Sequence, residues 1–128
     1  MNFDELGLSK TLVSRLESLG LTKPTPIQEK AIPHAMNERD VLGIAQTGTG
    51  KTAAFSIPLI VALSKQNERA GARGVRGLIL SPTRELANQI VDTLQSITSD
   101  LRIRLVVGGK SINVQEQPLS RGTDVLVA

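Results

Sequence analysis

The chain has 128 residues, a hydrophobic fraction of 40% and a net charge of +3, which is enough for one domain with a buried core. It has no cysteine and a single histidine, His34, which excludes a disulfide framework and makes a metal site on His and Cys ligands untenable. No apolar run is long enough to span a membrane and no signal peptide is evident, so we expect a cytoplasmic protein without a membrane partner. Tyr and Trp are absent, which argues against a platform of stacked aromatic side chains. Any nucleic acid should therefore be held mainly through its backbone.

The first third of the chain is predicted to be helical. Residues 9–19 form a short amphipathic pattern with Ser9 as N-cap and Gly20 as a stop. Residues 25–28 form a capping box that starts a second helix, and Pro33 should kink or split that helix. Gln28 has two possible roles: it can cap this helix, or its amide can match N6 and N7 of adenine. The local pattern favours the cap.

A phosphate loop occupies residues 45–52. The apolar run 40–44 before it is predicted to be a buried strand, and a helix is predicted from Lys51 onward. The loop glycines can aim backbone N–H groups at phosphate oxygens, Lys51 supplies a positive charge, and the Thr52 hydroxyl is placed for magnesium. Ala45 stands where the general pattern has its first glycine. The alternative is a glycine-rich turn without a ligand, which the flanking strand and helix disfavour.

The following helix and loop complete the middle of the chain. An apolar helix face, interrupted by Pro58, is expected from Phe55, Ile57, Leu59, Ile60 and Leu63. Residues 65–77 are rich in Gly and Arg and predict an exposed, mobile loop, whose arginines we expect to be solvated.

Strands and helices alternate in the last third of the chain. A buried strand is predicted at 78–80, and a helix capped by Ser81 or Thr83 should follow it, with an apolar face from Leu86 to Ile97. A strand with one polar face is predicted at 101–107, a second helix at 111–119 and an apolar strand at 125–128. This alternation predicts a parallel α/β layer.

The motifs, in this order and at this spacing, closely resemble the N-terminal half of a DEAD-box RNA helicase core domain. The resemblance covers essentially the whole chain. It is carried by Phe3, Gly20 and 24–28 for the Q motif, 45–52 for motif I including its alanine, 82–87 for motif Ia, 108–109 for the GG element, and Gln115, Leu119, Gly122 and 124–128 for the approach to motif Ib.

The resemblance implies a RecA-like phosphate-loop fold, with a parallel sheet flanked by helices and the domain cut short. We expect a helical region at 1–39 that carries the Q motif and a partial RecA-like domain at 40–128. The cofactors implied are ATP and Mg²⁺, with Phe3 stacked on adenine, Gln28 reading its edge, Lys51 and Thr52 as catalytic residues and Thr52 as the metal ligand. The residues implied in nucleotide binding are Phe3, Lys23, Thr25, Gln28, Ala45, Gln46, Thr47, Gly48, Thr49, Gly50, Lys51 and Thr52, and those implied in RNA binding are Pro82, Thr83, Arg84, Gly108 and Gly109.

The resemblance further implies an RNA-stimulated ATPase that separates short RNA duplexes, acting as a monomer and binding RNA with weak sequence preference. No Asp or Glu closes an apolar strand, so the hydrolytic carboxylate is missing and we expect the fragment itself to be inactive. The main alternative is a non-catalytic adenine-nucleotide-binding module. A DNA helicase of the same superfamily is disfavoured by the Phe3–Gln28 spacing and by residues 82–87. A GTPase is disfavoured because the chain has no Asn-Lys-x-Asp string, which would read guanine.

Overall fold

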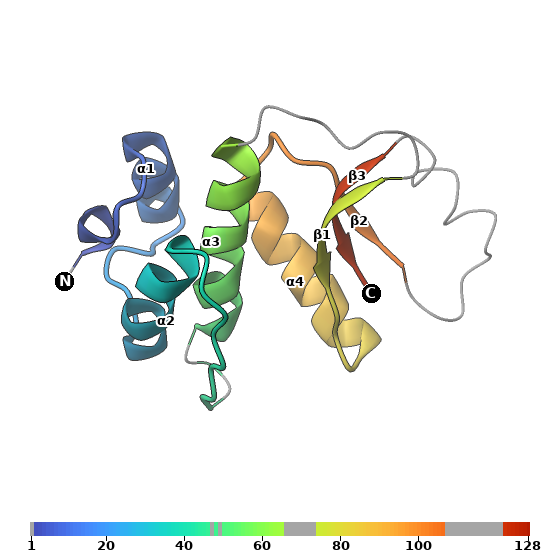
Figure 1. Cartoon of the computed structure of the whole chain (residues 1–128), viewed down its shortest axis with the longest axis horizontal. Coiled ribbons are helices and arrows are strands. Elements are labelled where there is room, and N and C mark those ends of the chain that lie inside the picture. The colour runs from blue at the N-terminus through green and yellow to red at the C-terminus, as the bar shows by residue number, and fades with distance from the viewer. Residues whose placement is uncertain (1, 47, 49, 66–73, 107–121) are drawn as a thin grey trace. The chain divides into compact units, whose positions relative to one another are not determined.

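A computed structural model describes residues 2–46, 48, 50–65, 74–106 and 122–128. The chain divides into two compact units, Met1–Ala62 and Leu63–Ala128 (Figure 1). The boundary predicted after residue 39 was drawn from the positions of the motifs, whereas these units are defined by contacts. It stays a prediction. Among the described residues, no helix is both long and apolar enough to cross a membrane.

The first unit consists of helices. They are η1 (Phe3–Leu6), α1 (Lys10–Ser18), α2 (Pro26–Met36) and most of α3 (Lys51–Lys65). The predicted start of the first helix is confirmed, because the Ser9 hydroxyl accepts a hydrogen bond from Leu12 N at 3.2 Å. The predicted helices from residue 25 and from Lys51 are also confirmed. Phe3, Leu16, Ile32 and Ile57 are the largest fully buried side chains of this unit.

The two internal prolines do not divide their helices. Helix α2 continues through Pro33 and α3 continues through Pro58. Of the kink or split predicted at Pro33, the split is therefore excluded, and the interruption predicted at Pro58 is wrong. Each proline removes one backbone donor, but the residue before each, Ile32 or Ile57, is completely buried and keeps the helix packed. Phe55, predicted in the core face of α3, is exposed instead.

The apolar run before the phosphate loop is not a buried strand. Residues 41–46 have no regular secondary structure, and Leu42 and Ile44 are 87% and 85% exposed. A strand needs a neighbour to pair its backbone N–H and C=O groups. In the described part of the chain, strand pairing joins only Val75–Ile79, Ile103–Leu105 and Thr123–Val127, so residues 41–46 have no strand with which to pair. The predicted buried strand at 40–44 is therefore wrong in both its secondary structure and its burial.

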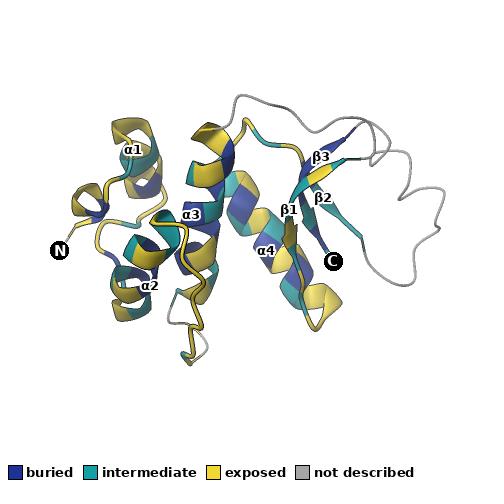
Figure 2. Cartoon of the chain, in the orientation of Figure 1, coloured by how far each residue is buried: buried dark blue, intermediate teal, exposed yellow. Residues whose placement is uncertain are grey.

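The second unit is a parallel sheet with a helix on it. Strands β1 (Val75–Ile79), β2 (Ile103–Leu105) and β3 (Thr123–Val127) lie in the order β1-β3-β2, and both pairings are parallel. Helix α4 (Arg84–Ile97) contacts β2 and β3. Its buried and exposed positions alternate around the helix (Figure 2), and Ile90, Leu94 and Ile97 are buried. The predicted RecA-like α/β class is confirmed.

The outer strand β1 differs from its prediction. It begins at Val75, three residues before the predicted start, and Leu78 is 59% exposed rather than buried. Among the described strands, β1 pairs on one side only, with β3, and α4 packs on the other two strands. Burial of an apolar strand depends on such neighbours, which the local sequence does not reveal. The predicted mobile loop at 65–77 falls mostly on residues 66–73, and the GG element and helix 111–119 fall on 107–121; these segments lie outside the described residues.

One ion pair joins β1 to β3, and its arginine also donates a hydrogen bond to the end of α3. Arg76 Nη1 lies 2.8 Å from Asp124 Oδ1, and Arg76 Nη2 donates to Leu63 O at 2.6 Å. The second carboxylate oxygen of Asp124 accepts from Arg102 N at 2.7 Å. Both side chains are largely buried, and these bonds offset the cost of removing their charges from water. The pair therefore fixes the start of all three strands.

Candidate nucleotide site and nucleic-acid-binding turn

The phosphate loop leads directly into α3. Its Gly48 and Gly50 have φ values of +84° and +88°, a conformation that residues with a side chain rarely adopt. Lys51 is the first residue of α3, and its Nζ donates to Ala45 O at 2.5 Å, which closes the loop on itself. Thr52 follows and is half-buried, whereas Gln46 is exposed. Thr47 and Thr49 lie outside the described residues.

Gln28 links the capping box to the phosphate loop. The side chain is only 2% exposed. Its Oε1 accepts from Thr25 N at 2.9 Å, which confirms the predicted cap, and its Nε2 donates to Gly50 O at 3.2 Å. A Cβ atom added to Gly50 would lie 2.4 Å from this Nε2 and 3.1 Å from Thr25 Oγ1. Gly50 is therefore required both for its backbone conformation and for this close approach.

The amide of Gln28 keeps unused hydrogen-bonding capacity. An amide has two N–H donors and an oxygen with two lone pairs, and the two bonds to Thr25 and Gly50 use one donor and one lone pair. Capping and base recognition are therefore compatible. The contact with adenine stays a prediction.

Phe3 lies at a pocket of about 230 Å³. Its ring is 2% exposed and belongs to η1. Lys23, also expected at the nucleotide, lines the same pocket, whereas Gln28 is not among the lining residues. The structure thus groups the predicted residues into a pocket with Phe3 and Lys23, and a loop contact with Thr25, Gln28 and Gly50.

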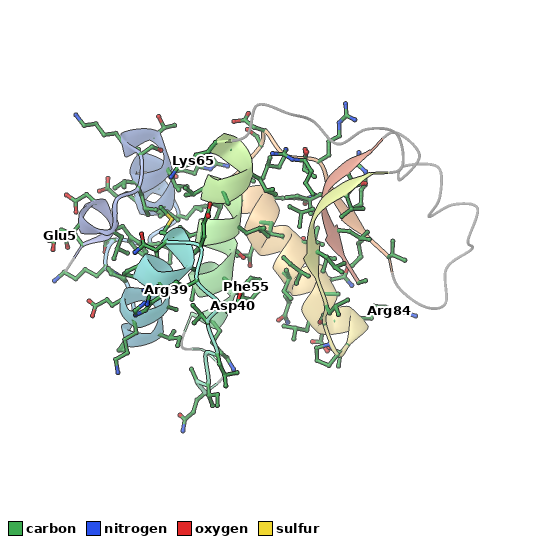
Figure 3. The ribbon with its side chains drawn as sticks, viewed as in Figure 1. Glu5, Arg39, Asp40, Phe55, Lys65 and Arg84 are labelled. Atoms are coloured by element: carbon green, nitrogen blue, oxygen red, sulfur yellow. The ribbon has the colours of Figure 1, made fainter. Side chains whose placement is uncertain are left out.

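The turn between β1 and α4 presents the residues expected to bind RNA. Pro82, Thr83 and Arg84 are exposed, with Arg84 at the beginning of α4 (Figure 3). The Thr83 hydroxyl accepts from Leu86 N at 3.1 Å, which confirms the predicted cap, and Ser81 N donates to Ala128 O at 2.7 Å. This helix N-terminus with an adjacent arginine suits a phosphate group. Gly108 and Gly109 lie outside the described residues.

The charge of the chain is divided unevenly between the two units. Residues 1–62 contain six Lys and Arg and six Asp and Glu, whereas residues 63–128 contain nine and six. The entire net charge of +3 therefore belongs to the unit with the exposed turn. A positive unit attracts a polyanion through long-range electrostatics.

A metal ion would have few protein ligands here. No group of three His, Cys, Asp or Glu side chains occurs in the part of the chain that the structure describes. The Thr52 hydroxyl, at the start of α3 beside Lys51, fits a magnesium ion whose other ligands are phosphate oxygens and water. Such an ion would arrive with the nucleotide.

Comparison with known proteins identifies the family. The family model described as DEAD/DEAH box helicase matches residues 25–128. The chain belongs to this family. It is 42% identical to the pre-mRNA-processing ATP-dependent RNA helicase prp-5 of Neurospora crassa, over 98% of the chain and 11% of that protein. It is 44% identical to the ATP-dependent rRNA helicase RRP3 of Debaryomyces hansenii, over 99% of the chain and 26% of that protein.

A solved structure supports the same assignment. The crystal structure of the RNA helicase Prp28 from Chaetomium thermophilum bound to ADP superposes with a TM-score of 0.87 at 40% identity, over 99% of the chain and 31% of that structure. The chain therefore spans between about a tenth and a third of the proteins it matches.

Sequence reasoning missed three features of the two units. They are the bond from Gln28 to Gly50, the pairing of Arg76 with Asp124, and the presence of Asp4 and Glu17 in the wall of the Phe3 pocket. Only the opposite charges of Arg76 and Asp124 offered a signal, and many other pairs in the chain share it.

Proposed function

We propose that this chain binds ATP and the RNA backbone as part of an ATP-dependent RNA helicase. The observation that carries the proposal is the hydrogen bond from Gln28 Nε2 to Gly50 O, which connects the residue expected at the base to the loop expected at the phosphates. The printed names of the relatives, an ATP-dependent RNA helicase and an ATP-dependent rRNA helicase, support the same function.

The phosphates would be bound by the loop and by the first turn of α3. Lys51 has three N–H donors, so it can keep its bond to Ala45 O and still reach the phosphate oxygens. The unpaired N–H groups at the start of α3 add further donors and the positive end of the helix dipole. Thr52 would hold a magnesium ion, whose charge offsets that of the phosphates.

The base would lie at the pocket beside Phe3. An adenine would occupy the space lined by Phe3 and Lys23, and because Phe3 is only 2% exposed, η1 would have to shift for the ring to stack on the base. Gln28 keeps one N–H and one lone pair beyond its bonds to Thr25 and Gly50, but it does not line this pocket, so its contact with the base would require a rearrangement on binding. A ligand that recruits this amide also acts on Gly50, so binding of the base and binding of the phosphates should be coupled.

RNA would bind at the turn of Thr83 and Arg84. The exposed helix N-terminus and the guanidinium group suit phosphate oxygens, and the net positive charge of residues 63–128 favours a polyanion. Because such contacts carry little sequence information, we expect weak sequence preference and strong salt dependence. A large preference for one RNA sequence would contradict this.

Thermal unfolding monitored by circular dichroism tests the nucleotide site. A ligand that binds only the folded state adds about 2.7 kcal/mol at 100 times its Kd, which raises the melting temperature by roughly 10 °C for a chain of this size. We expect Mg-ADP to raise it and Mg-GDP to have little effect. Lys51→Ala is the matched variant, because this exposed side chain contributes little to stability and should lose the ADP effect. No shift with ADP would refute the proposal.

Hydrolysis belongs to the whole protein. The chain spans 11% and 26% of its two curated relatives, so ATPase and helicase activity are proposed for the longer protein. RNA-stimulated release of phosphate by that protein would support the helicase. Nucleotide binding without such release would favour the non-catalytic adenine-nucleotide-binding module.

A further inference from the structure

Helix α3 has residues in both compact units of the chain. It begins at the phosphate loop with Lys51 and ends with Lys65, and the boundary between the units falls inside it, between Ala62 and Leu63. Among the described elements, α3 alone is shared in this way. Its first turn is the part proposed to bind phosphates, whereas its last turn belongs to the unit that contains the sheet. Because a rigid helix can carry energetic coupling between distant sites, the contacts of this last turn decide whether the sheet responds to the phosphate loop.

An arginine of β1 binds the last turn of α3. The last four carbonyl groups of a helix have no partner within the helix, and Leu63 O is one of these four in α3. It accepts a hydrogen bond from Arg76 Nη2 at 2.6 Å. The positive guanidinium group also interacts favourably with the negative end of the helix dipole. The Leu63 side chain is buried, so this turn is packed as well as capped.

The same guanidinium group is bonded to the rest of the sheet. Arg76 Nη1 lies 2.8 Å from Asp124 Oδ1 in β3, and Asp124 Oδ2 accepts from Arg102 N, just before β2. Arg76 and Asp124 are 14% and 5% exposed, so water competes little for these bonds. The planar fork of arginine makes two bonds in fixed directions at once, a geometry that the ammonium group of lysine does not reproduce. Arg76 therefore connects the end of α3 with all three strands.

We propose that Arg76 is a positioning residue that couples nucleotide binding at the start of α3 to the stability of the sheet. Phosphates bound at the first turn stabilise the helix, and the bond from Arg76 to Leu63 O extends this stabilisation to β1 and β3. The inference rests on the proposed function, since it requires that a nucleotide binds at the phosphate loop. It gives the buried ion pair a role beyond holding the strands together.

Hydrogen exchange followed by NMR, with and without Mg-ADP, tests the coupling amide by amide. A ligand that binds only the folded form, at 100 times its Kd, slows the exchange of the amides that it protects about 100-fold. We expect this slowing in α3 of the unchanged chain. In β1 and β3 we expect about 10- to 100-fold, because the coupling cannot exceed the value of one hydrogen bond to a charged group. Arg76→Lys keeps the positive charge but not the fork, so it should keep the slowing in α3 and lose most of it in the sheet.

Arg104→Lys is the matched control. Arg104 is a half-buried arginine of the same sheet, and its Nη1 donates to Ile103 O of its own strand rather than to α3. We expect this variant to keep the full effect of ADP on β1 and β3. A purely structural role of Arg76 would lower the protection of the sheet equally with and without ADP, and would leave the effect of ADP unchanged.

The outcomes separate the inference from the proposed function. An equal effect of ADP on the sheet in Arg76→Lys and in the unchanged chain overturns the inference alone, as does slowing confined to α3 in the unchanged chain. No effect of ADP on any amide overturns the proposed function and the inference with it. If Arg76→Lys does not fold, Asp124→Asn replaces it, because it removes the charge that holds the guanidinium group. That variant must also reduce the effect of ADP on the sheet.

Discussion

Replacing Gly50 by alanine tests the contact between the capping box and the phosphate loop. The new Cβ atom would lie 2.4 Å from Gln28 Nε2, so the amide must move away and lose its bonds to Gly50 O and Thr25 N. Two such bonds contribute about 1–3 kcal/mol. Alanine at a φ of +88° costs about 1–2 kcal/mol more. We expect a total destabilisation of roughly 2–5 kcal/mol.

Thermal unfolding by circular dichroism measures this loss. At roughly 4 °C for each kcal/mol in a chain of this length, Gly50→Ala should lower the melting temperature by about 8–20 °C. Gly48→Ala is the matched control, because Gly48 has a φ of +84° but no atom within 4 Å of the added Cβ. It should lose only the conformational part, about 1–2 kcal/mol.

A double variant decides whether Gln28 causes the difference. In a Gln28→Ala background the added Cβ atom no longer meets the amide, so Gly50→Ala should cost about as much as Gly48→Ala. The reasoning is refuted if Gly50→Ala and Gly48→Ala lower the melting temperature equally in the unchanged background. It is also refuted if the full cost of Gly50→Ala persists after Gln28 is removed.

Three further substitutions test other contacts. Arg76→Ala leaves the Asp124 carboxylate, 5% exposed, without its charged partner, and should lower the free energy of unfolding in urea by about 3–5 kcal/mol; the double variant with Asp124→Ala should cost less than the sum of the two single changes. Thr83→Ala removes the cap of α4 and should cost about 1 kcal/mol, so an unchanged melting temperature would contradict the cap. Glu38→Gly should raise the melting temperature by a few degrees, because Glu38 has a φ of +61° just after α2, a position where glycine is favoured; a lower melting temperature would contradict this.

Features that depend on residues close in sequence could be predicted. In the caps at Ser9 and Thr83, the side-chain hydroxyl accepts from the N–H three residues later. Both partners lie within one helical turn, so the local sequence is enough to predict the bond. The glycine-rich turn before Lys51 is equally local, and its helix begins where the pattern indicates. The parallel class followed from alternation of elements alone.

Features that depend on residues distant in sequence could not be predicted. Leu42 and Leu78 both occur in apolar runs typical of buried strands, but burial requires a strand or helix beside them. Arg76 and Asp124 are 48 residues apart, and nothing local joins them. The role of Gln28 was left open for a related reason, since its second bond reaches 22 residues along the chain.

The strand order has a consequence for the time at which the sheet can form during synthesis. Among the described strands the central one is β3, which comes last in sequence, and β1 and β2 each pair only with it. At about 5–20 residues per second, β1 is made roughly 2–10 s before its partner. During that interval the backbone of β1 has no strand to pair with. Helix α4 also lacks β3, one of the two strands on which it packs. Assembly of this unit therefore waits until Thr123–Val127 has been made, and the newly made chain depends on staying unaggregated until then.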